Sequence, residues 1–161
     1  MTEGDLKAGR RVSESASEYS ELALPNDANG LGNLLGGKIM HLVDLAGAIA
    51  AIKHCRNVVV TASMDHMDFL HPVRIGQLVR LRSSVNRAFR TSLEVGVKVW
   101  VDDLISGSQR HVSSAFLTFV SIDAEGRGVP VPPVIPETED EKRRYEEAGA
   151  RRAYRLSQRP R

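Results

Sequence analysis

The chain has 161 residues, of which 42% are hydrophobic and 26% charged, as is typical of one soluble globular domain. A formal net charge of +2 at pH 7 is too small to indicate nucleic acid or a membrane surface as a partner. The single cysteine excludes an internal disulfide, and the polar first twenty residues hold no apolar core for a secretory signal. We therefore expect a cytoplasmic protein.

The N-terminal part of the chain offers little that a core could bury. Residues 1–16 are predominantly polar, so we expect a flexible arm there. A short first strand is predicted over residues 18–24, ending before Pro25.

A glycine-rich loop at residues 29–37 leads into a run that is apolar on every side. From Ile39 to Ile52 only His41 and Asp44 are polar, which predicts a helix buried on most of its surface. Fourteen residues are too few for a membrane span. Three of the four residues three or four positions from Asp44, namely Met40, Gly47 and Ala48, are small or apolar. An ionised carboxylate is costly in such surroundings unless it has partners. Asp44 is therefore a candidate for chemistry.

Four strands are predicted after this helix, over residues 58–67, 77–86, 91–101 and 110–122. The third shows the clearest alternation, since Leu93 and every second residue to Val101 are apolar. Short connections between the strands indicate an antiparallel meander. A sheet curled around one helix would leave part of the helix and one sheet edge uncovered, which indicates a homo-oligomer.

Residues 129–161 differ in character from the rest of the chain. A proline-rich connector spans residues 129–136. Thr138, followed three residues later by Glu141, predicts the start of a helix through a capping box. We expect this charged helix to be a solvated appendage.

Several motifs in this order resemble the hotdog-fold family of cytosolic acyl-CoA thioesterases. They are Gly32-Asn33-x-x-Gly36-Gly37, Asp44-x-Ala46-Gly47, Thr61-x-Ser63-x-Asp65, Arg90-Thr91-Ser92-x-Glu94-Val95 and Phe119-Val120-x-x-Asp123-x-x-Gly126. The resemblance implies an α+β hotdog domain over residues 17–128, with an antiparallel sheet wrapped around one long central helix. It also implies protomers that pair edge to edge, dimers that assemble into hexamers, and an acyl-CoA substrate bound at the dimer interface.

The resemblance implies a pair of functional residues, Asn33 and Asp44, that opposite protomers contribute to one site. Asp44 would serve as general base or as nucleophile, and Asn33 would position water or the thioester carbonyl. The N–H groups of Gly36 and Gly37, at the start of the helix, could hold the oxyanion. A structural aspartate and a turn asparagine remain the alternatives.

The resemblance implies that Arg90, Thr91 and Ser92 lie near the ligand, so we expect them to bind coenzyme A phosphates, with a solvated turn as the alternative. Arg127 and the C-terminal arginines are weaker candidates. Coenzyme A belongs to the substrate, and we expect no separate cofactor.

Other clusters are weaker candidates for chemistry. Four residues at 65–71 invite a metal site, but Asp65 points away from His66 and Asp68 on a strand, so no metal is expected. His54 and Cys55 are adjacent on a helix and do not face each other.

The resulting prediction is hydrolysis of acyl-CoA to free fatty acid and coenzyme A. A non-catalytic acyl-CoA sensor is one alternative; such sensors usually carry a DNA-binding helical module, which is lacking in the sequence. The other alternative is a hotdog dehydratase, which would need a histidine in the loop before the helix, where residues 29–37 contain none.

Overall fold

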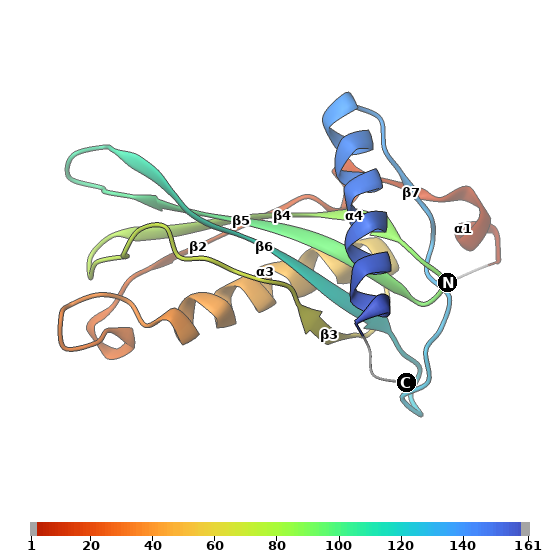
Figure 1. The fold of residues 1–161 in the computed structure, drawn as a ribbon, viewed down its shortest axis with the longest axis horizontal. Coiled ribbons are helices and arrows are strands. Elements are labelled where there is room, and N and C mark those ends of the chain that lie inside the picture. The colour runs from red at the N-terminus through yellow and green to blue at the C-terminus, as the bar shows by residue number, and fades with distance from the viewer. Residues whose placement is uncertain (1–2, 159–161) are drawn as a thin grey trace.

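The computed structural model describes residues 3–158 and consists of a curled antiparallel sheet with a long helix on one face and a second helix on the other (Figure 1). The five strands follow in the spatial order β2 (Ser17–Leu22), β4 (Leu78–Ala88), β5 (Ser92–Asp102), β6 (Gln109–Ser121) and β3 (Val59–Met64). The central helix α3 spans Gly36–Cys55. All five predicted strands and the predicted helix are therefore present, in an α+β hotdog arrangement.

The core lies between α3 and the inner face of the sheet. Small residues on α3, such as Ala46 and Ala50, are buried and let the sheet approach the helix closely. At Gly47 the approach is so close that an added Cβ atom would lie 3.0 Å from the ring of Phe119. The alternation along β5 places Val95, Val97 and Val99 in this core, as the period of two predicts.

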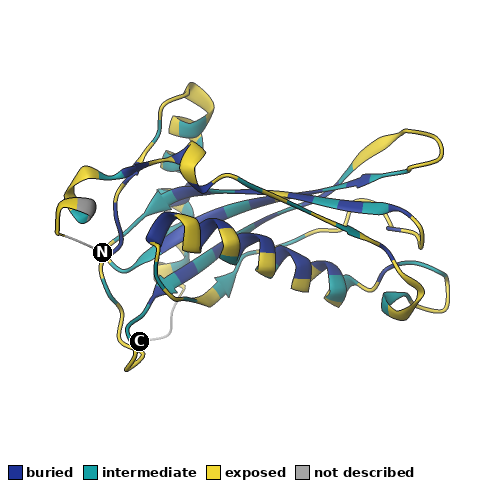
Figure 2. Cartoon of the chain, turned by 180° about the vertical axis from the view of Figure 1, so that it is seen from behind, coloured by how far each residue is buried: buried dark blue, intermediate teal, exposed yellow. Residues whose placement is uncertain are grey.

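One side of α3 is not covered by any of residues 3–158. Met40, Leu45, Ile49 and Ile52 are exposed, and yellow patches recur along the helix in Figure 2. Among the strands of the described part of the chain, the neighbouring edge strand β3 pairs with β6 alone, and it is exposed over residues 60–62. An apolar helix stripe beside a free sheet edge is the surface that a second protomer could cover.

The N-terminal segment differs from the flexible arm that its polarity suggested. It forms α1 (Glu3–Ala8), β1 (Arg10–Arg11) and α2 (Val12–Ser15), and β1 pairs in parallel with β7 (Val134–Ile135). The hydroxyl of Ser15 accepts a hydrogen bond from the N–H of Val85, and both Val12 and Ser15 are buried. Long-range contacts therefore order this segment. A short 3-10 helix, η1 (Pro25–Asp27), precedes the glycine-rich loop.

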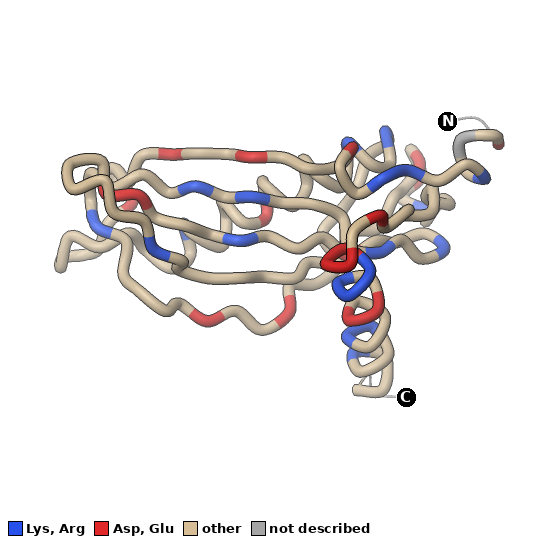
Figure 3. The backbone as a smooth tube through the Cα atoms, turned by 90° about the horizontal axis from the view of Figure 1, so that it is seen from above, with Lys and Arg blue, Asp and Glu red and all other residues tan. Residues whose placement is uncertain are grey.

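The C-terminal helix α4 (Glu139–Ser157) begins as predicted, with Thr138 and Glu141 forming the capping box. It is not a solvated appendage, however. Figures 1 and 2 show it crossing the sheet on the face opposite α3, and Ala148 is fully buried. Basic and acidic residues alternate along its length (Figure 3), and several reach side chains of the sheet. No helix within residues 3–158 combines the length and apolarity that a membrane crossing requires.

Candidate active site

Asp44 and Thr61 meet where α3 passes under the edge strand. The Thr61 hydroxyl donates a hydrogen bond of 2.6 Å to Oδ1 of Asp44. Thr61 faces the helix because it lies opposite Phe119 in the β3–β6 register, and Phe119 packs against α3. A short bond from a hydroxyl to a carboxylate is charge-assisted and orients the acceptor firmly.

The second oxygen of Asp44 remains available. Between residues 3 and 158, Thr61 is the one side chain that hydrogen-bonds this carboxylate. Asp44 is partly buried within the chain and lies on the apolar, uncovered side of α3. The arrangement therefore holds a carboxylate in a defined orientation while leaving one oxygen for a water molecule or an electrophile.

The loop before α3 places Asn33 through its backbone. The carbonyl of Asn33 accepts from the N–H of Asn29 at 2.8 Å, and Asn33 also forms an antiparallel bridge with Arg74. The side chain of Asn29 accepts from the N–H groups of Leu31 at 2.9 Å and Asn33 at 3.2 Å. Within the described part of the chain, the carboxamide of Asn33 has no hydrogen-bond partner, so it is free to meet a ligand.

Gly36 and Gly37 are the first two residues of α3, where N–H groups have no acceptor inside the helix. The N-cap residue Leu35 provides no side-chain cap. An added Cβ atom at Gly37 would meet nothing within 4 Å, so the space beside its Cα is open. These amides could therefore receive a negatively charged oxygen.

The parts of the site are separated within one chain. Asp44 lies eight residues beyond Gly36, which corresponds to about 12 Å along the helix axis. None of the described contacts links Asn33 to Asp44. A site that uses both the loop and the carboxylate therefore requires the loop of another protomer.

The predicted substrate-binding residues lie at the turn between β4 and β5, and the structure places Arg90 apart from Thr91 and Ser92. Arg90 is exposed, and its carbonyl accepts from the N–H of Val131 at 3.1 Å. Thr91 and Ser92 instead line a cavity beneath the C-terminal end of α4.

The remaining polar clusters have other roles. Asp65 forms an ion pair with Arg155, while His66 contacts Asp68 at 3.0 Å on the surface. No group of three or more metal-ligating side chains occurs within residues 3–158. Burial lowers the pKa of His54 and raises the pKa of Cys55 to about 12, so Cys55 is a thiol at neutral pH.

Thr61 is the residue that the sequence did not single out for the site, although it belongs to one of the motifs. The position of Thr61 on the predicted strand was the feature of the sequence that could have identified it. Thr61 shares a face with Val59, so a hydroxyl stands where the alternation expects an inward side chain.

Comparison with known proteins places this geometry in a family. The model of the thioesterase superfamily matches residues 31–107. YkhA of Bacillus subtilis, called an uncharacterized acyl-CoA thioester hydrolase, is 42% identical over 132 residues, covering 82% of this chain and 77% of the relative. The human cytosolic acyl coenzyme A thioester hydrolase is 39% identical over 142 residues. These residues are 87% of this chain but only 37% of the human protein.

Solved structures agree with this placement. The acyl-CoA hydrolase of Bacillus cereus has a TM-score of 0.88 at 43% identity, with 92% of this chain and 90% of that one covered. An apo-hexameric acyl-CoA thioesterase has the same TM-score at 39% identity, with 92% and 96% covered.

The acyl-CoA hydrolase of Staphylococcus aureus provides a further comparison through its alanine variants. The aspartate variant is 34% identical to this chain, with a TM-score of 0.85 and 92% of each chain covered. Variants of an asparagine fifteen positions before that aspartate and of a threonine seventeen positions after it have also been solved. The chain belongs to the acyl-CoA thioester hydrolases of the thioesterase superfamily.

Proposed function

We propose that this protein hydrolyses acyl-CoA to a free fatty acid and coenzyme A, with Asp44 as the catalytic carboxylate. The observation that carries the proposal is the Thr61–Asp44 hydrogen bond of 2.6 Å on the uncovered side of α3. Family membership supports the reaction class. The same spacing that separates the substituted aspartate and threonine of the Staphylococcus aureus hydrolase separates Asp44 and Thr61 here.

Asp44 can serve the reaction by either of two routes. As general base it accepts a proton from water while the oxygen adds to the thioester carbonyl carbon. As nucleophile its free oxygen attacks that carbon to form a mixed anhydride, which water then hydrolyses. In both routes the C–S bond breaks, and coenzyme A leaves as a thiolate that takes up a proton.

The N–H groups of Gly36 and Gly37 stabilise the negative oxygen that forms on the carbonyl carbon. Because they lie about 10–12 Å from Asp44 along the helix in one chain, they act from the partner protomer. The proposed route uses protein groups alone, and coenzyme A enters as part of the substrate. We propose a homo-oligomer built from dimers and assembled as a hexamer, which hexameric relatives support.

Two asparagines compete for the role of positioning water or the carbonyl. Asn33 is the residue predicted from the sequence, and its carboxamide has no hydrogen-bond partner among residues 3–158. Asn29 precedes Asp44 by the fifteen positions that separate the substituted asparagine and aspartate in the Staphylococcus aureus enzyme. In the single chain, however, the Asn29 side chain is engaged in holding the loop. Alanine variants at both positions distinguish the two roles.

The test is free-thiol release from acyl-CoAs of short to long chain by the wild-type protein and Asp44→Ala. Turnover in the wild type that is abolished in Asp44→Ala, with the oligomer intact by size-exclusion chromatography, supports the proposal. Binding of acyl-CoA without turnover on any chain length would refute it and favour the sensor. In the same assay, the larger fall in kcat between Asn29→Ala and Asn33→Ala identifies the functional asparagine.

A further inference from the structure

The edge strand β3 carries a β-bulge directly after Thr61. Thr61 lies opposite Phe119 of β6, and Ser63 lies opposite the residue just before it, Thr118. Ala62 is therefore an extra residue in β3, which the ladder between β3 and β6 leaves unpaired. A bulge of this kind changes the face of the sheet toward which the side chains beyond it point.

The bulge lets side chains of β3 reach both faces of the sheet. Residues directly opposite each other in a ladder share a face, and buried Phe119 marks the inner face of β6. Thr61 therefore faces α3. Ser63 faces outward with Thr118, and Asp65, two residues later, does so as well. In a regular strand Thr61 and Asp65 would share one face, because the side-chain period is two.

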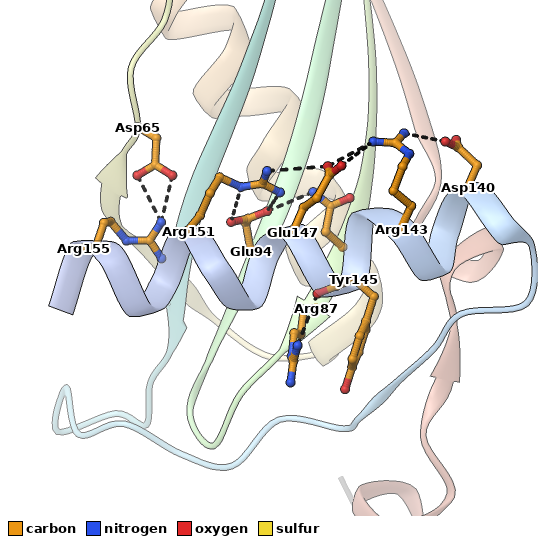
Figure 4. Close-up of polar contacts among 10 residues, drawn as sticks. Asp65, Arg87, Glu94, Asp140, Arg143, Tyr145, Glu147, Arg151 and Arg155 are labelled. Atoms are coloured by element: carbon orange, nitrogen blue, oxygen red, sulfur yellow. Dashed lines mark hydrogen bonds and ion pairs between the residues drawn. The ribbon is translucent and has the colours of Figure 1, made fainter. Parts of the chain in front are cut away.

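Asp65 is held on the outer face by α4. Its two carboxylate oxygens accept from Nη1 of Arg155 at 3.1 and 2.8 Å (Figure 4). The side chains of Arg155 and Asp65 are 23% and 19% exposed, so solvent screens this ion pair only in part. The N–H of Asp65 also donates to the carbonyl of Phe116 at 2.9 Å. The chain just after β3 is thus fixed to both β6 and α4.

The helix α4 is a firm support for this ion pair. One turn before Arg155, the guanidinium of Arg151 lies 2.7 Å from the fully buried carboxylate of Glu94 on β5. The same guanidinium lies over the ring of Phe116 at 3.6 Å. Ala148, about one turn earlier still, is also fully buried. Arg155 therefore projects from a helix segment whose position over the sheet is already set.

We propose that Arg155 and Asp65 are positioning residues for the hydrolysis of acyl-CoA, because their ion pair locks the bulge that aims Thr61 at Asp44. This inference rests on the proposed function. A bulge bends its strand and increases the local twist, so the direction of the Thr61 side chain depends on it. The regular register that keeps Thr61 on the inner face would carry Asp65 to that face too, away from Arg155. The ion pair therefore opposes the slip that would remove the bulge.

The test measures kcat and KM for thiol release in Arg155→Met and Asp65→Asn, with the oligomer verified by size-exclusion chromatography. Each substitution should lower kcat roughly three- to tenfold with little change in KM, since a partly exposed ion pair contributes less than the Thr61 bond itself. A variant with both substitutions should match the single variants, because each removes the same pair. Lys142→Met is the matched control. It removes a 2.8 Å ion pair with Glu139 that stays within α4, and kcat should not change.

Thr61→Val distinguishes positioning from a merely structural role. When Thr61 is already replaced by valine, Arg155→Met should have no further effect on kcat, because the hydroxyl through which the ion pair acts is missing. A further fall of the same size would mean that Arg155 serves activity by another path and would overturn the proposal. A raised KM with unchanged kcat would assign Arg155 to substrate binding and would overturn it as well.

Hydrogen exchange keeps this proposal separate from the hydrolase proposal. The amides of residues 59–65, followed by mass spectrometry, should exchange faster in Arg155→Met and Asp65→Asn than in the wild type or Lys142→Met. Faster exchange there supports the lock on the bulge even if the wild type shows no turnover. Turnover in the wild type, with neither kcat nor exchange altered by Arg155→Met, refutes the positioning role alone.

Discussion

Replacing Thr61 by valine should slow hydrolysis without disturbing the strand that carries it. Valine has nearly the shape of threonine and a high strand propensity, so β3 keeps its pairing with β6. The substitution removes the hydroxyl that donates to Oδ1 of Asp44 at 2.6 Å. The carboxylate then loses its one side-chain hydrogen bond among residues 3–158 and can rotate away from the attacking geometry.

The size of the effect follows from the kind of bond. A hydrogen bond to a charged group contributes about 1.5–3 kcal/mol. At 1.36 kcal/mol for each factor of ten in rate, its loss from the transition state predicts a fall in kcat of roughly 10- to 150-fold. KM should change little, because Thr61 orients Asp44 rather than the acyl-CoA.

The assay is thiol release with saturating acyl-CoA, together with size-exclusion chromatography to verify the oligomer. Thr61→Ser is the control, because it keeps the hydroxyl, and its kcat should stay within a few-fold of the wild type. A Thr61→Val protein that is folded, assembled and as active as the wild type would refute the idea that this hydrogen bond orients Asp44.

Three further predictions concern stability. Arg151→Met leaves the fully buried carboxylate of Glu94 without the guanidinium that lies 2.7 Å away (Figure 4). The substitution should lower the free energy of unfolding, measured in urea, by about 3 kcal/mol. A change of less than about 1 kcal/mol would contradict this. Gly47→Ala places a Cβ atom 3.0 Å from a buried ring and should cost about 1–3 kcal/mol, whereas Gly30→Ala, in open space, should be neutral by the same measurement. Burial lowers the pKa of His54 below its ordinary 6.5. As the pH falls through 6.5, His54 therefore binds a proton in the unfolded chain but not in the folded protein, and the free energy of unfolding decreases. Urea unfolding between pH 5 and 8 should show a shallower loss in His54→Gln, and identical slopes would disprove this role.

The cavity lined by Thr91 and Ser92 shows how a site prediction can be only partly accessible from sequence. Thr91 and Ser92 were expected to bind substrate together with Arg90, their neighbour in the chain. The structure instead faces Thr91 and Ser92 toward Arg152, about sixty residues later, because α4 folds back over the outer face of the sheet. Chain proximity does not decide which side of a turn an arginine occupies.

The elements themselves were readable from the sequence because they depend on local pattern. The alternation from Thr91 to Val101 predicted a strand that the structure places at Ser92–Asp102, and the apolar run around Asp44 predicted α3. Thr138 and Glu141 predicted the start of α4. In each case the physical cause, side-chain periodicity or a cap, acts between residues at most a few positions apart.

Tertiary structure decided what those elements touch. The Thr61–Asp44 bond spans seventeen residues, and the Arg155–Asp65 ion pair spans ninety. Such contacts depend on strand register and on how α4 packs, and neither leaves a periodic signal in the chain. For the same reason residues 10–15 are ordered although their composition is polar, since Ser15 is held by β4. The sequence alone determined a hotdog domain with a carboxylate on its central helix, and only the folded chain determined that carboxylate's partner.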